Sequence, residues 1–290
     1  MRFKKVDLSF QSCNSEYNAA DVVIFSAPMD TTTSFRPGTR FAGNAVRVDS
    51  IGIEWYSPYR NLSLKDFKTC DIGDLDFGVG NIKLQLSEIF NTTKRILKDN
   101  KTPIMIGGEH LASYSTIKAV YEKYPDLRVI HFDAHTDLRE SFLGNTYSHA
   151  TFMRHVNEFL GDHKIYQFGI RSGDKEEFDW AKDHIYQHKY DLETLDSVVE
   201  EIKNFPVYIT IDLDVLDPAV FPGTGTPEPG GITYKELLKA FDLFEKLTNI
   251  VGSDLMELSP YLDASGASNM AAIKALREMI LLIQKNKSNK

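Results

Sequence analysis

The sequence contains only two cysteines, Cys13 and Cys70, among its 290 residues. Neither lies in a metal-binding or redox spacing, and two are too few for a disulfide framework, so a reducing cytoplasm is the expected setting. No window approaches the roughly 18 apolar residues of a membrane-spanning helix, and the N-terminal stretch lacks the apolar run of a secretory signal. We therefore expect a cytoplasmic chain with no membrane partner.

Basic residues are also fewer than acidic residues. Lys and Arg number 33 against 41 Asp and Glu, which gives a formal net charge of −8. A chain of this sign is not expected to carry a general nucleic-acid-binding surface, whereas a small cationic substrate is compatible with it. Internal repeats, low-complexity linkers and breaks in composition are absent from the sequence. We expect residues 1–290 to form a single domain, and a chain of this length can bury most of its apolar surface.

Short apolar stretches alternate with segments of helical periodicity along most of the chain. The expected strands are 21–26, 102–106, 127–132, 164–169, 206–211 and 250–255. The expected helices are 45–54, 81–99, 113–124, 151–159, 175–184, 194–203, 234–247 and 267–284. This alternation predicts an α/β fold with a mostly parallel sheet covered by helices on both faces. Residues 31–43 are expected to form a long loop, of the kind that is often functional.

Residues 129–137, with the sequence VIHFDAHTD, are the most informative stretch. An apolar strand runs directly into Asp133, His135 and Asp137 at alternate positions. Alternate side chains of an extended strand point to the same side, so these three can converge. Two carboxylates and an imidazole suit a divalent metal ion, and they suit a hydrophobic core badly because an unpaired buried carboxylate is costly. A solvent-exposed polar turn is the competing interpretation of this stretch alone.

Three other predicted strands also end in polar residues, and sites in open α/β sheets form at the carboxyl ends of strands. His110 follows a Gly-Gly pair, which permits a tight turn. Asp212 and Asp214 end another strand at alternate positions, and Glu257 ends the last one. Taken singly, His110 is also compatible with an ordinary loop histidine, and Glu257 with a capping or surface carboxylate. Asp217 precedes a proline and is interpreted as a structural turn residue.

Three of these strand ends together offer two histidines and four aspartates: His110, Asp133, His135, Asp137, Asp212 and Asp214. A zinc site needs about four ligands, so six donors fit two metal ions that share bridging carboxylates. Four carboxylates balance two divalent cations, and the oxygen-rich set favours a harder ion such as Mn²⁺ over Zn²⁺. A two-metal site commonly produces hydroxide from bound water near neutral pH, so the set supports hydrolysis.

These segments resemble the signatures of the ureohydrolases, the family of arginase, agmatinase and their relatives. The resemblance rests on residues 107–110, 133–137, 210–218 and 254–260, together with a Gly-x-Arg loop at 38–47. Asn44-Ala45 stands where the family usually has Gly-Pro, and Thr210 stands where serine is common; neither departure is expected to touch a ligand. The resemblance implies a three-layer α/β/α arginase-like fold and a centre with two Mn²⁺ ions per subunit.

The resemblance also implies a role for each candidate residue. One Mn²⁺ would take His110, Asp133, Asp137 and Asp212, and the other would take His135, Asp133, Asp212 and Asp214. Asp133 and Asp212 would then bridge the two ions, together with a hydroxide. Glu257 would hold the guanidinium group of the substrate by a charge-assisted hydrogen bond. His149 would contact the substrate and carry protons, although spacing alone would make it an ordinary loop histidine.

The mechanism that follows from this resemblance is hydrolysis of a linear C–N bond in an amidine. The hydroxide would attack the guanidinium carbon, while the metal ions and Glu257 position the group and stabilise the tetrahedral intermediate. Asp137 would accept the hydroxide proton and pass it to the leaving amine. The products would be urea and a primary amine. Family analogy further implies a homotrimer or homohexamer.

Within the family, agmatine is the expected substrate, which would give putrescine and a role in polyamine biosynthesis. Arginine carries an α-carboxylate that a specific site must satisfy with donors. Residues 138–149 lack the Asn and the Ser-Ser-Gly-Asn run that serve this purpose in arginases, and their Leu-Arg start, Gly144 and Tyr-Ser-His end resemble bacterial agmatinases. Because Arg139 offers a cation to a carboxylate, 4-guanidinobutyrate is the second candidate, with arginine a further alternative.

Two interpretations from other classes remain at this stage. Histone-deacetylase-type enzymes resemble the arginase fold but use one zinc ion, and they would not need both His110 and Asp137. A metal-binding but inactive regulatory protein would lose ligand positions, and none is lost here. Metal analysis combined with a urea-release assay distinguishes these classes.

Overall fold

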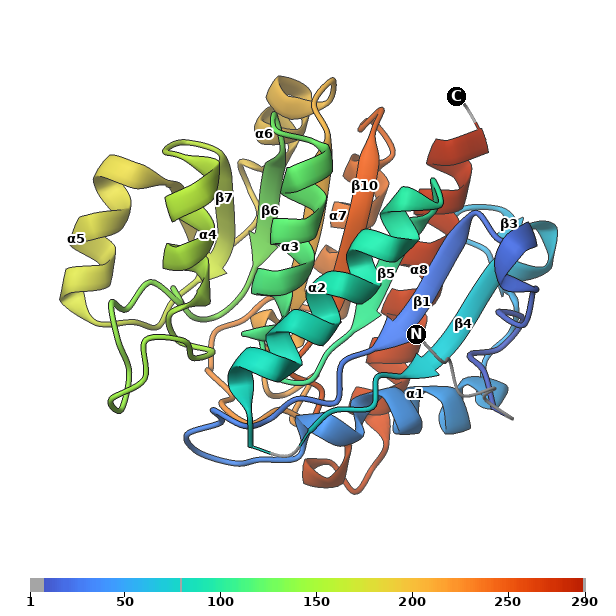
Figure 1. Cartoon of the computed structure of the whole chain (residues 1–290), viewed down its shortest axis with the longest axis horizontal. Coiled ribbons are helices and arrows are strands. Elements are labelled where there is room, and N and C mark those ends of the chain that lie inside the picture. The colour runs from blue at the N-terminus through green and yellow to red at the C-terminus, as the bar shows by residue number, and fades with distance from the viewer. Residues whose placement is uncertain (1–7, 79, 289–290) are drawn as a thin grey trace.

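The computed structural model describes residues 8–78 and 80–288, and its centre is one sheet of eight strands. The strands are β1 (Val22–Ser26), β4 (Thr69–Asp74), β5 (Thr102–Ile106), β6 (Arg128–Phe132), β7 (Ile165–Ile170), β8 (Tyr186–Lys189), β9 (Val207–Asp212) and β10 (Ile250–Met256). Their order across the sheet, which runs through the middle of Figure 1, is β4-β1-β5-β10-β9-β6-β7-β8. Every neighbouring pair is parallel, so all eight carboxyl ends lie along one edge.

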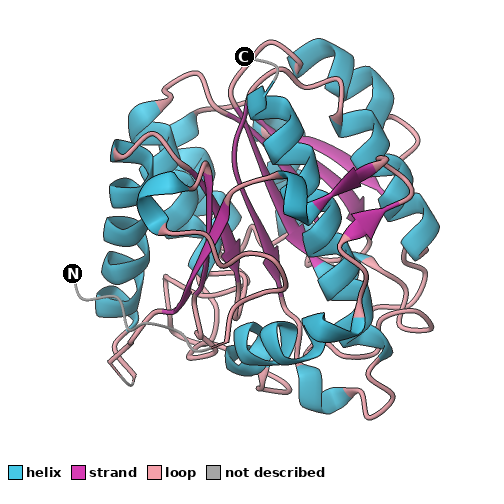
Figure 2. Cartoon of the chain, turned by 90° about the vertical axis from the view of Figure 1, so that its right-hand side faces the viewer, coloured by secondary structure: helices cyan, strands magenta, loops and turns pink. Residues whose placement is uncertain are grey.

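Helices cover both faces of the sheet, as the view in Figure 2 shows. One layer contains α2 (Ile82–Lys98), α3 (Ala112–Lys123), α4 (Phe152–Leu160) and α5 (Lys175–His184). The other contains α1 (Ala42–Asp49), α6 (Leu195–Ile202), α7 (Tyr234–Phe244) and α8 (Ala267–Ser288). None of the helices in the described part of the chain is both long and apolar enough to cross a membrane.

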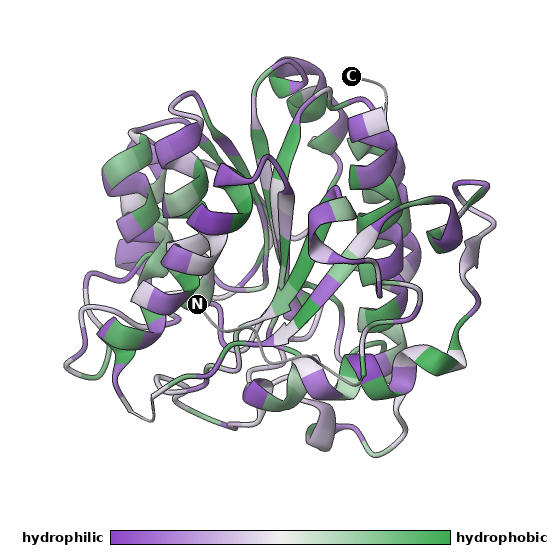
Figure 3. Cartoon of the chain, turned by 45° about the vertical axis from the view of Figure 1, so that its right-hand side comes forward, coloured by the Kyte–Doolittle hydropathy of each residue, from purple (hydrophilic) through white to green (hydrophobic). Residues whose placement is uncertain are grey.

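The core consists of two hydrophobic clusters, one on each side of the sheet. Alternate residues of a single strand enter different clusters: Val22 and Ile24 pack with the α1 side, whereas Val23 and Phe25 pack with the α2 side. A strand buried on both faces needs apolar residues at every position, which explains the continuous apolar runs of the sequence. Figure 3 shows this hydrophobic colouring along the central strands.

The expected fold class, a mostly parallel sheet in a three-layer α/β/α arrangement, is confirmed. All six expected strands and all eight expected helices are present, although α1 starts and ends earlier than the expected 45–54. Two sheet strands and a small hairpin, β2 (Tyr56–Ser57) with β3 (Leu62–Ser63), were not predicted. The strand β4 contains two aspartates and a glycine, and β8 is a short edge strand with the sequence YQHK. Neither has the apolar pattern of a buried strand.

A buried ion pair joins α1 to β4. Arg47 Nε and Nη2 lie 2.8 and 2.9 Å from the two carboxylate oxygens of Asp71, and both side chains are almost fully buried. We expect Arg47→Met to reduce the free energy of unfolding by about 3–5 kcal/mol, because it leaves a buried carboxylate without its partner. Urea denaturation measures this loss. Arg95→Met, which removes only an exposed pair with Asp99, is the control and should change little; equal losses in the two variants would contradict the argument.

Candidate functional site

The four motif-bearing strand ends follow the four central strands, β5, β10, β9 and β6, which are neighbours in that order. His110 comes four residues after β5, and Asp133 directly follows β6. Asp212 ends β9, and Glu257 directly follows β10. Because these strands are parallel, their ends meet at one edge of the sheet, which is where α/β sheets form sites. The structure therefore assembles segments that lie up to 147 residues apart, as His110 and Glu257 do.

The turn after β5 depends on its two glycines. A Cβ on Gly108 would lie 1.9 Å from the carbonyl oxygen of Met29, and one on Gly107 would lie 2.1 Å from Cε of Met256. A larger residue at Gly108 would clash with backbone, whereas one at Gly107 would require the Met256 side chain to move, so the glycines allow the turn to pass close to the neighbouring segments. That close approach places His110 over the ends of the other strands.

Two residues of the site have left-handed backbone conformations that L-residues seldom adopt. The φ angle is +54° at Asp137 and +63° at Glu257. Such residues cost of the order of 1–3 kcal/mol each and are found where surrounding structure holds them, often at functional sites. Here both side chains turn into the same cavity.

The first group of donors surrounds one nitrogen of His110. Its Nδ1 lies 3.1 Å from Asp133 Oδ2, 3.2 Å from Asp212 Oδ2 and 3.7 Å from Asp137 Oδ2. All four side chains are buried. These are the four residues predicted to bind the first metal ion, and the structure brings them together.

The second group surrounds His135. Its Nδ1 lies 3.0 Å from Asp214 Oδ2 and 3.5 Å from Asp133 Oδ1. Asp133 thus turns one oxygen toward His110 and the other toward His135, so it lies between the two groups. Asp212 lies beside this group, and its Oδ1 accepts a hydrogen bond from the backbone N–H of Asp214 at 2.8 Å.

The residues present fit two divalent cations. Burial, followed by the negative charge of Asp133, raises the pKa of Asp137 well above its usual range. Burial and the charge of Asp214 do the same to the pKa of Asp212. Burial opposes ionisation of Asp133 as well, but hydrogen bonds with three histidines hold its pKa well below the usual range. Crowded carboxylates repel one another, and bound cations offset that repulsion. Among the described residues, two groups have metal-binding spacing and share Asp133: His110, His131, Asp133 and Asp137, and Asp133, His135 and Asp214.

His131 belongs to this site, and the sequence reasoning missed it. Its Nε2 lies 2.8 Å from Asp133 Oδ2, and its Nδ1 lies 3.0 Å from the side-chain amide nitrogen of Gln167, a donor. Nδ1 therefore accepts, and Nε2–H donates to Asp133. Burial also lowers the pKa of His131, which favours this neutral ring. A hydrogen-bonding role behind the carboxylate fits these contacts, of the kind that orients metal ligands. The available signal was its position two residues before Asp133, on the same side of the strand.

Thr210 was expected to contact none of the proposed metal-binding residues, and this prediction is wrong. Its hydroxyl oxygen lies 2.8 Å from Nε2 of His110, and both residues are buried. This contact leaves Nδ1 of His110 to face the carboxylates. Threonine can make the same hydrogen bond that serine would make, so the departure from the family pattern conserves the chemistry.

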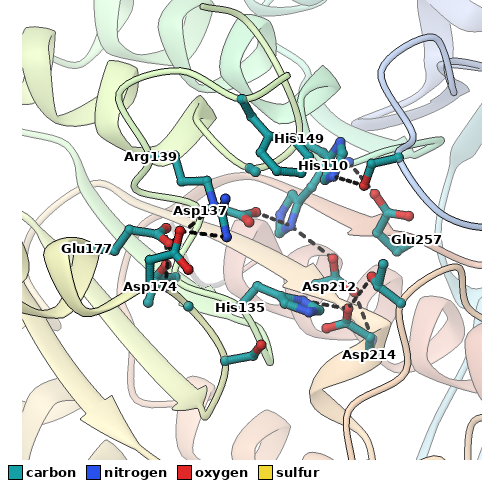
Figure 4. Close-up of a pocket in the computed structure, with 17 residues that line it drawn as sticks. His110, His135, Asp137, Arg139, His149, Asp174, Glu177, Asp212, Asp214 and Glu257 are labelled. Atoms are coloured by element: carbon teal, nitrogen blue, oxygen red, sulfur yellow. Dashed lines mark hydrogen bonds and ion pairs between the residues drawn. The ribbon is translucent and has the colours of Figure 1, made fainter. Parts of the chain in front are cut away.

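A cavity of about 260 Å³ opens above the two groups of donors. Figure 4 shows Glu257 and His149 beside this space, with His110, Asp137, Asp212, Asp214 and His135 around it. The Glu257 carboxylate accepts a hydrogen bond from the backbone N–H of His110 at 2.8 Å. Burial raises the pKa of Glu257 to about 7. Ser34, from the long loop at 31–43, also lines the cavity, so the structure places that loop at the site.

The wall of the cavity opposite Glu257 in Figure 4 contains Arg139. Its guanidinium group is paired with Asp174 at 3.0 Å and with Glu177 at 3.4 Å. Two carboxylates against one cation leave this cluster with a net negative charge. Asp217, interpreted as a turn residue, does accept hydrogen bonds from three backbone N–H groups, at 2.8 to 3.1 Å, within the loop that it begins.

Fold and site together define an α/β protein with a buried Asp–His cluster, suited to metal ions, at the carboxyl edge of a parallel sheet. Comparisons with known proteins narrow this class. Residues 20–282 match the model of the Arginase family. The agmatinase of Bacillus subtilis (strain 168) is 46% identical over 275 residues, which cover 94% of this chain and 95% of that protein. Proclavaminate amidinohydrolase of Streptomyces clavuligerus is 34% identical over 273 residues, which cover 90% of this chain and 87% of that protein.

The crystal structure of the agmatine ureohydrolase of Thermoplasma volcanium has a TM-score of 0.87 and 30% identity, with 99% of this chain and 97% of that chain covered. The chain therefore belongs to the arginase family. The resemblance inferred from its sequence motifs is confirmed, and with it the expectation of a ureohydrolase-type enzyme.

Proposed function

We propose that this enzyme hydrolyses agmatine to urea and putrescine. The observation that carries the proposal is the cavity itself, which places a buried carboxylate, Glu257, beside the cluster of histidines and aspartates. A buried carboxylate suits a cationic guanidinium, and the cluster suits cations that activate water. Relatives named as agmatinases, at 46% identity over nearly the whole chain, support the same substrate.

The ligand assignment is part of this proposal. One ion would be held by His110, Asp133, Asp137 and Asp212, and the other by His135, Asp133, Asp212 and Asp214. We propose Mn²⁺ for both, since four carboxylates against two imidazoles favour a hard cation. When bound, the ions supply Lewis acidity and an activated water near neutral pH.

The remaining steps belong to the side chains. Glu257 binds the guanidinium by a charge-assisted hydrogen bond and orients its carbon over the cluster. Asp137 accepts a proton as the carbon is attacked and passes it to the nitrogen of the departing amine, which its position beside the cavity permits. His149, on the cavity wall, takes up a proton from solvent and gives it to the amine, so that putrescine leaves protonated.

Agmatine is favoured over substrates with a carboxylate because the Arg139 guanidinium group is already paired with two carboxylates of the protein. Its two ion pairs, with Asp174 and Glu177, give this wall a net negative charge, which attracts an ammonium group and repels a carboxylate. We expect kcat/KM, measured by urea release with Mn²⁺ present, to be highest for agmatine among agmatine, arginine and 4-guanidinobutyrate. A preference for either carboxylate-bearing compound would overturn the agmatine assignment and leave the family assignment intact.

The wider setting is proposed on the same basis. We treat residues 1–290 as one ureohydrolase domain, supported by the single eight-stranded sheet that draws on strands from Val22 to Met256. A cytoplasmic location, a homotrimeric or homohexameric state and a role in polyamine biosynthesis follow from family analogy.

The raised pKa of Glu257 predicts a pH dependence. The carboxylate must be ionised to attract a guanidinium, and a group with a pKa of about 7 loses its proton as the pH rises through that value. We expect kcat/KM for agmatine to rise through neutrality and to be low in acid, because kcat/KM reports ionisations of the free enzyme. A pH profile of kcat/KM tests this, with metal content determined at each pH. An optimum well below neutrality in metal-loaded enzyme would contradict it.

A further inference from the structure

Glu109 is a buried carboxylate that the proposed mechanism does not use. It lies in the turn after β5 and is 1% exposed. Its oxygens accept hydrogen bonds from the backbone N–H of Thr32 at 3.0 and 3.1 Å, and from the hydroxyl of Thr32. Thr32 belongs to the long loop at 31–43. A charge buried in this way is costly unless it is satisfied, and here one threonine supplies all of the side chain's hydrogen bonds in the described structure.

Thr32 in turn contacts His149 twice. The backbone N–H of His149 donates to Thr32 Oγ1 at 3.1 Å. Nδ1 of the His149 ring lies 3.3 Å from the same oxygen. Three residues from three separate segments, Glu109, Thr32 and His149, therefore form one chain of contacts that ends at the proposed proton carrier.

The protons in this chain can be counted. A threonine hydroxyl has one hydrogen to donate and two lone pairs to accept with. The Thr32 hydroxyl donates its one hydrogen to Glu109 Oε2, so this hydrogen is not available to His149. The Thr32 oxygen accepts the backbone N–H of His149 with one lone pair and has one left. The ring contact can be a hydrogen bond only if Nδ1 of His149 carries the hydrogen.

The other neighbours of Nδ1 agree with this assignment. A Glu109 oxygen lies 3.7 Å from Nδ1, and a negative charge there favours an N–H over a lone pair. Ser148 Oγ, at 3.4 Å from Nδ1, accepts the backbone N–H of Ala150 and has a further lone pair for the same ring hydrogen. On the opposite side of the ring, Nε2 lies 3.3 Å from Ser34 Oγ, and both residues line the cavity.

We propose that Glu109 is a positioning residue that acts through Thr32 to hold His149 in the tautomer with its hydrogen on Nδ1. The Nε2 lone pair then faces the cavity, where it takes up a proton from solvent and gives it to the departing amine, while the Nδ1 hydrogen stays on the ring throughout. This inference rests on the proton-carrying role given to His149 under the proposed function.

Three variants test the Glu109–Thr32 and Thr32–His149 contacts separately. Thr32→Val removes the hydroxyl and keeps the shape, whereas Thr32→Ser keeps the hydroxyl and is the conservative rescue. In Glu109→Gln the amide can donate to the Thr32 oxygen, which frees the Thr32 hydrogen to point at Nδ1 and favours the opposite tautomer. Thr31→Val is the matched control, because the Thr31 hydroxyl donates to Gln85 and not to His149.

The direct test is neutron diffraction from deuterated crystals of the full chain loaded with Mn²⁺, at a pH above the ordinary pKa of histidine. We expect deuterium on Nδ1 of His149 and none on Nε2 in the wild type, and the reverse in Glu109→Gln. Deuterium on Nε2 with a bare Nδ1 in the wild type would overturn the inference. Because this measurement needs no turnover, it decides the tautomer even if the proposed reaction fails.

Kinetics supply the second test. We expect Thr32→Val to lower kcat on agmatine by about 10²-fold, within the range of an acid–base contribution, with KM and bound metal little changed. Thr32→Ser and Thr31→Val should retain most of the wild-type kcat. A Thr32→Val enzyme with wild-type kcat would overturn the inference, as would a loss that Thr32→Ser shares. A wild-type enzyme that releases no urea from any guanidino compound would instead overturn the proposed function.

Discussion

Replacing Asp133 with asparagine is expected to abolish urea release and to lower the bound metal content. Asp133 is fully buried and turns Oδ2 toward His110, at 3.1 Å, and Oδ1 toward His135, at 3.5 Å. Asparagine keeps the size of the side chain but removes its negative charge, and its NH₂ group cannot serve as a ligand on one of the two sides. Both proposed ions would lose a shared donor, so neither should remain tightly bound.

The measurement combines metal analysis after dialysis with a urea-release assay. Asp212→Asn should behave in the same way, because Asp212 is the second proposed bridge. Asp196→Asn is the control, since Asp196 pairs with Lys246 at the surface and should change neither readout. An Asp133→Asn or Asp212→Asn enzyme with two bound metal ions and full turnover would refute the bridging assignment.

The sequence allowed the strand ends to be predicted, but their arrangement required the structure. Asp133, His135 and Asp137 alternate along one short segment, so their convergence follows from local geometry. His110 and Asp212 meet this segment only because β5, β10, β9 and β6 are neighbours in the sheet. Strand order depends on how the whole chain packs, which local pattern does not encode. His131, by contrast, could have been predicted from the sequence. It lies two residues before Asp133, so the alternation of side chains along the strand places it on the same side.

Contacts between distant loops are what sequence reasoning could not supply. Thr32 and His149 are 117 residues apart and meet only where the long loop folds over the cavity. Arg139 is a similar case: its sequence left open whether it binds a substrate carboxylate, and only its ion pairs with Asp174 and Glu177 show that its charge is already balanced. Such features depend on packing among loops, whose conformations are set by the rest of the fold.

His149→Ala is expected to lower kcat by about 10²–10⁴-fold while both metal ions stay bound. Losing a general acid–base group typically costs this much. The ring lies on the cavity wall, partly exposed, and its hydrogen-bonding contacts are with Thr32, Ser34 and Ser148 rather than with the aspartates of the cluster. Removing it therefore takes away a proton carrier without taking away a proposed ligand.

The comparison of His149→Ala with Asp133→Asn separates proton transfer from metal binding. Steady-state kinetics on agmatine and metal analysis on the same samples are the readouts. His184→Ala is the matched control, since His184 pairs with Asp162 at the surface and should leave both unchanged. A His149→Ala enzyme with wild-type turnover would remove His149 from the mechanism, and one stripped of metal would make it part of the metal centre. If kcat falls and metal content holds, the reaction needs a proton carrier on the wall that faces the departing amine.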